Sequence, residues 1–208
     1  MMKGLEDEGV EIATDATDAT AAARLVGSTG PFRCILADPP WKFRNQSTHL
    51  SPEKQGHYQT LNETEIYDFA DLVKGWADPA GCHLWLCSPD VLVLDGTAQR
   101  VAASWGFAPK QILHWEKTTD DEASERFGGG NWMRTVTESI VLCTRGKNVK
   151  PLVRNVSNKI DGPISRHSAK PNALYRRIET ISPGQRLEMF ARGSLRPNWN
   201  AIWGNEVC

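Results

Sequence analysis

Short apolar runs alternate with helical patterns along this chain, and this alternation restricts the fold more than any other feature. The apolar runs are flanked by Pro, Gly or charged residues, which is typical of strands buried on both faces of a sheet. They lie at residues 32–37, 83–87, 110–116, 138–143, 186–191 and 201–203. Apolar residues recur at helical spacing over 62–75, 91–105 and 172–180. This order predicts an α/β fold, with a doubly wound, mostly parallel sheet and helices on both faces.

The chain divides into a short acidic segment and one domain. Residues 1–28 are rich in Ala, Thr, Asp and Gly, and they predict a loose tail or a short helix over 11–25. Residues 29–208 contain no internal repeat and no long linker, so we expect a single domain there. A domain of this size can bury a core without disulfides or metals.

Cysteine usage and hydropathy predict a cytoplasmic protein. The five cysteines are odd in number and form no Cys-x-x-Cys pair, which argues against a disulfide framework and a zinc ribbon. Cys82, His83 and Cys87 lie close in sequence but lack a second pair of ligands, so no metal site is predicted. The chain has no apolar run of about 18 residues for a membrane span, and its acidic start lacks the apolar core of a secretory signal.

The net charge of −1 conceals an asymmetry along the chain. Residues 1–20 carry six acids and one base, a net charge of −5, whereas residues 145–208 carry twelve Lys or Arg and four acids, a net charge of +8. A basic last third favours a polyanionic partner or ligand, and a solvated basic surface is the alternative.

The tetrapeptide Asp38-Pro-Pro-Trp41 directly follows the first predicted strand. Prolines offer carbonyl oxygens and no N–H, and an ionised Asp also only accepts hydrogen bonds. Such a rigid group of acceptors complements the exocyclic amine of a nucleobase, and Trp41 can stack on that base. Asp38, Pro39 and Pro40 are therefore candidate catalytic residues that orient an amine, with Trp41 beside them. A Pro-Pro turn with a purely structural Asp is the alternative.

The tetrapeptide resembles motif IV of S-adenosylmethionine-dependent amino methyltransferases that make N6-methyladenine. Later elements resemble the MT-A70 family in order and spacing, namely Arg166-His-Ser-Ala-Lys-Pro171, Leu187-Glu-Met-Phe-Ala-Arg192 and Trp199-Asn-Ala-Ile-Trp-Gly-Asn205. The resemblance covers about residues 32–206. It implies a class I, Rossmann-like methyltransferase in which the catalytic motif precedes the cofactor motif.

The resemblance also implies which residues bind S-adenosyl-L-methionine. Lys170 matches the lysine near the methionine carboxylate, Arg192 matches a ribose-side arginine, and Asn205 with Glu206 matches the pair that binds the ribose diol. Many members have Gln where this chain has Glu206, and a carboxylate accepts from a diol equally well. Asp38 belongs to the cofactor site as well as to the catalytic group. Glu188 is expected to have a basic partner such as Arg166 or Lys170.

A base in a duplex must be flipped out, or be unpaired already, to reach such a site. We expect the surrounding loops, 42–60 and 117–134, to hold the backbone of the nucleic acid. The candidate substrate-binding residues are Lys42, Arg44, Tyr58, Lys117 and Arg134. Core packing is the expected role of Trp85.

The predicted activity is methylation of adenine N6 in nucleic acid, with either a homodimer or a paralogous partner subunit. The resemblance to compact bacterial and phage members favours DNA over RNA and a bacterial or phage cytoplasm. One alternative is another amino group, such as cytosine N4. A second alternative is a catalytically inactive subunit that binds nucleic acid for a partner.

Overall fold

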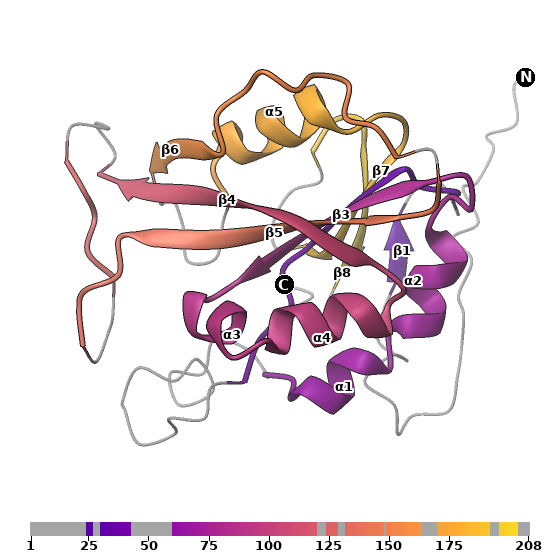
Figure 1. Ribbon diagram of the computed structural model, residues 1–208, viewed down its shortest axis with the longest axis horizontal. Helices are drawn as coiled ribbons and strands as arrows, with labels where there is room; N and C mark the ends of the chain where they lie inside the picture. The colour runs from indigo at the N-terminus through magenta and orange to yellow at the C-terminus, as the bar shows by residue number, and fades with distance from the viewer. Residues whose placement is uncertain are drawn as a thin grey trace, which may run out of the picture.

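One eight-stranded sheet runs through the protein, with the strand order β1-β8-β7-β2-β3-β5-β4-β6 (Figure 1). The computed structural model describes residues 24–26, 30–42, 60–119, 124–128, 132–147, 149–163, 170–191 and 196–203. The strands are β1 (Arg24–Val26), β2 (Cys34–Ala37), β3 (Cys82–Ser88), β4 (Ala108–Thr118), β5 (Thr137–Arg145), β6 (Lys159–Pro163), β7 (Arg186–Ala191) and β8 (Trp199–Trp203). The helices are α1 (Glu63–Tyr67), α2 (Ala70–Trp76), α3 (Asp90–Leu94), α4 (Thr97–Ser104) and α5 (Asn172–Ile181).

Most of the described strands point in one direction. β2 is parallel to β3 and to β7, and β7 is parallel to β8. β5 is antiparallel to both β3 and β4, β6 is parallel to β4, and β1 is antiparallel to β8. Only β1 and β5 are therefore reversed among the described strands, which confirms the predicted mostly parallel sheet. The carboxyl ends of β2, β3, β4, β7 and β8 meet at one edge, where open α/β sheets bind ligands.

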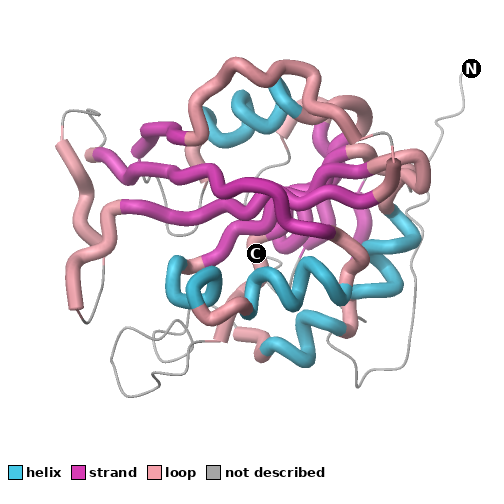
Figure 2. Tube along the Cα trace, in the orientation of Figure 1, coloured by secondary structure: helices cyan, strands magenta, loops and turns pink. Residues whose placement is uncertain are grey.

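Helices cover both faces of the sheet, as predicted (Figure 2). Helices α1 to α4 lie on one face and α5 lies on the other (Figure 1). The alternation within β2 shows the division, because Ile35 and Ala37 belong to the core under α1–α4, whereas Cys34 and Leu36 belong to the core under α5. Burying one such Leu or Ile side chain stabilises the fold by about 1.5–3 kcal/mol.

The predicted helix over 62–75 is two helices. Asn62 begins α1 with a capping box, in which its side chain accepts from the Glu65 N–H at 3.0 Å and its own N–H donates to the Glu65 carboxylate at 2.7 Å. The chain then turns before α2. The buried Trp105 indole donates to the Ile66 carbonyl at 3.0 Å, at the point where α1 ends.

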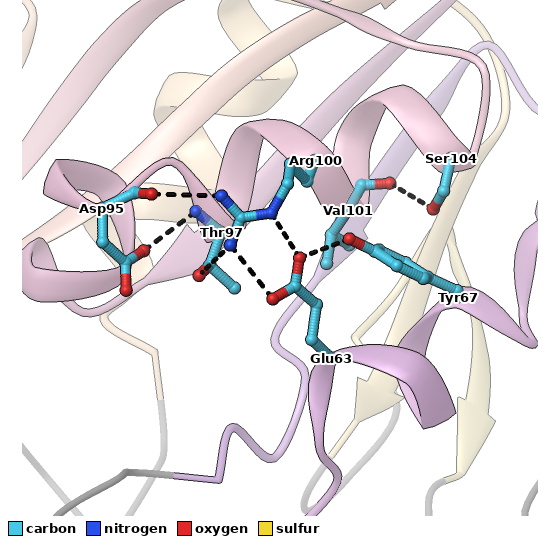
Figure 3. Close-up of polar contacts among 7 residues, drawn as sticks. All are labelled: Glu63, Tyr67, Asp95, Thr97, Arg100, Val101 and Ser104. Carbon is cyan, nitrogen blue, oxygen red and sulfur yellow. Dashed lines mark hydrogen bonds and ion pairs between the residues drawn. The ribbon is translucent and has the colours of Figure 1, made fainter.

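A polar cluster ties α1 to α4 and to the turn before α4 (Figure 3). Arg100 donates to both carboxylate oxygens of Glu63, at 2.6 and 3.0 Å, and Tyr67 donates to the same carboxylate. Arg100 also donates to Thr97 Oγ1 at 2.9 Å and to the Asp95 carbonyl at 3.1 Å. The predicted helix over 91–105 breaks at this turn, where Gly96 has a φ of 82°.

One part of the sequence prediction needs correction. Residues 24 and 25 lie in strand β1 and not at the end of a helix over 11–25, and the rest of the predicted tail lies outside the described residues. Residues 159–163 form β6, whose pairing with the edge of β4 no local pattern indicates. Of the described helices, none is both long enough and apolar enough to cross a membrane.

Candidate active site at the carboxyl edge of the sheet

The backbone of the Asp38-Pro-Pro-Trp41 segment is held at the carboxyl end of β2. The Trp41 N–H donates to the Pro39 carbonyl at 2.8 Å, and the Leu61 N–H donates to the Pro40 carbonyl at 2.7 Å. The Lys42 N–H returns to the Leu61 carbonyl at 3.0 Å, which makes a short parallel bridge. Both proline carbonyls therefore already accept one hydrogen bond from the chain. Each keeps a second lone pair for an incoming amine.

Trp41 pins this segment to the sheet. Its side chain is 6% exposed and belongs to the core under α1–α4. Its indole N–H donates to the Cys87 carbonyl, on the neighbouring β3, at 2.9 Å. Trp41 therefore anchors this segment, a role that sequence reasoning missed. Stacking on a base stays a prediction, and it requires that one face of this buried ring become accessible.

Four charged side chains meet beside Asp38. The ammonium nitrogen of Lys170 lies 3.0 Å from Asp38 Oδ2 and 3.1 Å from Glu138 Oε2. Lys117 reaches the other oxygen of Glu138 at 2.9 Å. We call Asp38, Lys117, Glu138 and Lys170 the charged cluster. They come from the ends of β2, β4 and β5 and from the start of α5, so only the tertiary fold brings them together.

An indole ring lies near both ammonium groups of the charged cluster. The nitrogens of Lys117 and Lys170 each lie 5.8 Å from the centre of the Trp115 ring. The Trp115 N–H donates to the Gly162 carbonyl at 2.9 Å. A Cβ on Gly162 would stand 2.6 Å from Pro171, so a glycine is needed for the chain before α5 to pass this close. This packing sets the position of Lys170, which immediately precedes Pro171.

Glu138 and Lys170 are both ionised around neutral pH. Burial by itself favours a neutral Lys170, but the carboxylates of Asp38 and Glu138 outweigh burial and raise the pKa of Lys170 well above its usual value. Burial also acts to raise the pKa of Glu138, but the ammonium groups of Lys170 and Lys117 hold it at about 2. The side chain of Lys170 is 7% exposed, whereas Asp38 and Glu138 are 24% and 30% exposed, so the two carboxylates are more accessible than the ammonium group between them.

Glu188 is a further carboxylate on the α5 side of β7. Its described hydrogen-bond partner is the Tyr175 hydroxyl, which donates to it at 2.9 Å. Arg166, one of the two basic partners expected from the sequence, lies outside the described residues. Burial raises the pKa of Glu188, and the charge of Asp38 adds to that effect. Burial raises the pKa of the Cys87 thiol well above its usual value, and the carboxylates of Asp38, Glu138 and Glu188 add to this effect.

Comparison with known proteins identifies the fold family. A family model described as MT-A70 matches residues 32–206. The chain belongs to the MT-A70 family. Methyltransferases of this family use S-adenosylmethionine as the methyl donor. This agrees with the class I methyltransferase fold that the motif order implied.

Several curated methyltransferases are similar to this MT-A70 chain. It is 27% identical over 186 residues to the N(6)-adenosine-methyltransferase MT-A70-like protein of Drosophila melanogaster, covering 86% of this chain and 27% of that protein. It is 25% identical over 186 residues to the N(6)-adenosine-methyltransferase subunit METTL3 of Danio rerio, covering 88% and 29%. The human catalytic subunit METTL3 is 25% identical over 190 residues, with the same coverage. The chain thus spans less than a third of the length of these relatives.

The described part of the MT-A70 site fits the methyl donor. Lys170 has three N–H groups, of which two are directed at Asp38 and Glu138, so a third can reach the carboxylate of the methionine part. Asp38 and Glu188 offer acceptors for the ammonium group at the same edge. The other residues predicted to bind the cofactor, Arg192, Asn205 and Glu206, lie outside the described residues.

The structure does not bring all predicted substrate-binding residues of this MT-A70 chain together. Lys42 is exposed immediately after Trp41, and Arg134 is exposed on the connection between β4 and β5, where it donates to the Gly128 carbonyl at 2.6 Å. Lys117 is instead part of the charged cluster. Arg44 and Tyr58 lie outside the described residues. Sequence reasoning missed Glu138, for which the only signal was an acid at the start of an apolar strand.

Proposed function

We propose that this chain transfers a methyl group from S-adenosylmethionine to the N6 amine of adenine in nucleic acid, with DNA as the main substrate. The observation that carries the proposal is the position of Asp38, which directly follows a buried strand and shares Lys170 with Glu138 at the ligand-binding edge. RNA is the second candidate, because the relatives are named for adenosine. The relatives that support adenine N6 as the target are about 25% identical to this chain.

Asp38, Pro39 and Pro40 orient the amine. S-adenosylmethionine supplies an electrophilic methyl group on a sulfonium. The Asp38 carboxylate and a proline carbonyl accept from the two amine hydrogens, so that the nitrogen lone pair is turned out of conjugation and toward the donor. Catalysis is then mainly by positioning, and no group needs a strongly shifted pKa before attack. The proton released after transfer goes to Asp38 or to water.

Lys170 holds the acceptor group in place. Its contact with Asp38 fixes one carboxylate oxygen and leaves the other directed at the amine. Glu138 and Lys117 fix Lys170 in turn. Because the buried Lys170 ammonium group is held between two carboxylates, it keeps the Asp38 side chain in one position. Catalysis by positioning requires an acceptor that is fixed in this way.

The target base is flipped out or unpaired, and loops beside the site hold its strand. The connection between β4 and β5 projects from the sheet (Figure 1), and hydrogen bonds such as Gly128 N–H to Thr135 carbonyl at 2.7 Å order its described part. We propose that Arg134 on this connection, together with Lys42, Arg44, Tyr58 and Lys117, contacts the nucleic acid.

A homodimer or a paralogous partner subunit, in a bacterial or phage-infected cytoplasm, is also part of the proposal. The described tip of the same connection exposes large apolar side chains, with Trp132 97% and Met133 83% exposed. Apolar patches of this kind mark interaction surfaces. Light scattering of the purified chain and of Trp132→Ser tests whether this surface supports self-association.

Nucleoside mass spectrometry tests the activity. The purified chain is incubated with S-adenosylmethionine and with single- or double-stranded DNA or RNA. We expect N6-methyladenine in DNA, and Asp38→Asn should lower its rate at least about 100-fold because the amide presents an N–H toward the amine. Glu65→Gln, at the distant N-terminus of α1, is the matched control. N4-methylcytosine alone, or donor binding without transfer on any substrate, would contradict the proposal.

A further inference from the structure

A cavity of about 180 Å³ lies on the α5 face of the sheet, away from the charged cluster. Its floor is formed by Trp85, Leu113 and Leu142, which come from three neighbouring strands, and Ile181 at the end of α5 forms one wall. Leu113 and Lys117 are four residues apart on β4, which separates the cavity from the charged cluster by about 13 Å along the strand. The cavity is therefore a second site, distinct from the candidate active site.

The connection between β5 and β6 covers this cavity. Its described residues 149–158 run beside α5 (Figure 1). At one end, the Leu152 N–H donates to the Ile181 carbonyl at 2.8 Å. At the other end, the Asn158 side chain donates to the Ile112 carbonyl of β4 at 3.2 Å. Because the cover is tied at both ends to the elements beneath it, the space under it is a fixed feature of the fold.

The walls of the cavity are mostly apolar. Pro151, Val153 and Val156 of the cover complete the apolar lining. The Trp85 N–H donates to Ser182 Oγ at 2.8 Å, so its ring leaves only carbon atoms for the cavity. An apolar cavity of about 150 Å³ holds one benzene ring. The space on the α5 face therefore has room for one six-membered ring with a small substituent.

The polar part of the lining is basic. It is contributed by Gln111, Arg154, Ser157 and Asn158. Within the described part of the chain, the Arg154 guanidinium makes no hydrogen bond and no ion pair. Residues 149–158 contain Lys150 and Arg154 and no acid. An arginine with unused N–H groups beside an apolar wall favours a ligand that carries a carboxylate.

We propose that this cavity binds a small aromatic carboxylate, with the ring between Trp85 and Val156 and the carboxylate on Arg154. The inference is independent of methyl transfer. The apolar walls disfavour an anion without an apolar body, because such an anion would lose its water and gain no packing. Arg154 favours the acid over an uncharged compound of the same shape. Phenylacetate, with one ring and one carboxylate, is a suitable probe.

NMR titration of the full ¹⁵N-labelled chain tests the site. We expect phenylacetate to shift the Trp85 indole N–H signal and the backbone amide signals of residues 152–158, with a dissociation constant of at most about 1 mM. The uncharged 2-phenylacetamide should bind at the same place at least about tenfold more weakly. Acetate, which has no ring, should leave the Trp85 signal unchanged. Equal shifts with acetate and phenylacetate, or no shift at Trp85, would overturn the inference.

Three variants separate a built site from general attraction of an anion to a basic surface. Arg154→Gln should weaken phenylacetate binding at least about tenfold and leave 2-phenylacetamide binding unchanged. Arg176→Gln is the matched control, since this exposed arginine of α5 does not line the cavity, and its affinity should stay within about twofold. Val156→Phe places a ring in the cavity and should weaken the binding of both ring compounds, with thermal unfolding as the check on its fold. Equal losses in Arg154→Gln and Arg176→Gln would contradict the proposal, whatever the stability of Val156→Phe.

Discussion

Replacing Lys170 by methionine tests the charged cluster directly. The pKa of Glu138 lies at about 2, against an ordinary value of 4.5. Since one pKa unit corresponds to about 1.4 kcal/mol, Lys170 and Lys117 together outweigh burial and favour the ionised carboxylate by a net of about 3 kcal/mol. The two ammonium groups are almost equally distant, at 3.1 and 2.9 Å, so each supplies about half. Lys170 also pairs with Asp38, and we therefore expect Lys170→Met to lower the free energy of unfolding by about 2 kcal/mol at pH 7.

Urea unfolding at several pH values measures this effect. The pKa of Glu138 is depressed in the folded state, so its contribution is complete above pH 4.5 and is lost as the pH falls toward 2. The difference between the unaltered chain and Lys170→Met should thus be largest at pH 7 and should narrow below about pH 4.5. Lys117→Met is the matched control, because it removes only one ion pair, and it should cost about 1 kcal/mol. A Lys170→Met chain that unfolds within about 0.5 kcal/mol of the unaltered chain at pH 7 would refute the reasoning.

Two further predictions concern buried side chains, His83 at the amino end of β3 and Trp41 in the site. Burial, together with the charge of Arg33, holds the pKa of His83 at about 4, below its ordinary value of 6.5. Because the unfolded chain takes up a proton between pH 6.5 and 4 and the folded chain does not, the free energy of unfolding should fall by about 3 kcal/mol as the pH drops through this window. His83→Gln should flatten this dependence in urea titrations between pH 7 and 4.5, and an unchanged slope would exclude His83 as its source. Trp41→Phe keeps a ring but leaves the Cys87 carbonyl without its donor, so it should lower the free energy of unfolding by about 1–2 kcal/mol. Equal urea midpoints for Trp41→Phe and the unaltered chain would show that the anchor is unimportant.

Much of the fold follows from local pattern. The run at 83–87 is a strand because a short, nearly continuous apolar run is typical of a strand buried on both faces of the sheet, and all of β3 is buried. Asp38 was predicted at a strand end because the two prolines after it cannot continue a ladder. The helical spacing over 62–75 and 91–105 was correct in kind, but each segment is two helices. The first is interrupted where the indole of the distant Trp105 contacts the Ile66 carbonyl, and the second at a local turn, where Gly96 has a positive φ.

The partners in the site depend on contacts between distant parts of the chain. Lys170 meets Glu138 and Asp38 across 32 and 132 positions, and no local pattern states which strands are neighbours or that β5 is reversed. The sequence also does not indicate the β-bulge in β7, where pairing with β8 passes from Met189 to Ala191 and leaves Phe190 as the extra residue. Local sequence determines which segments become strands and helices, because the backbone preferences of the residues and the spacing of apolar side chains are short-range properties. The packing of the whole sheet decides which charges meet and where β7 bulges, because those energies exist only once remote elements are in contact.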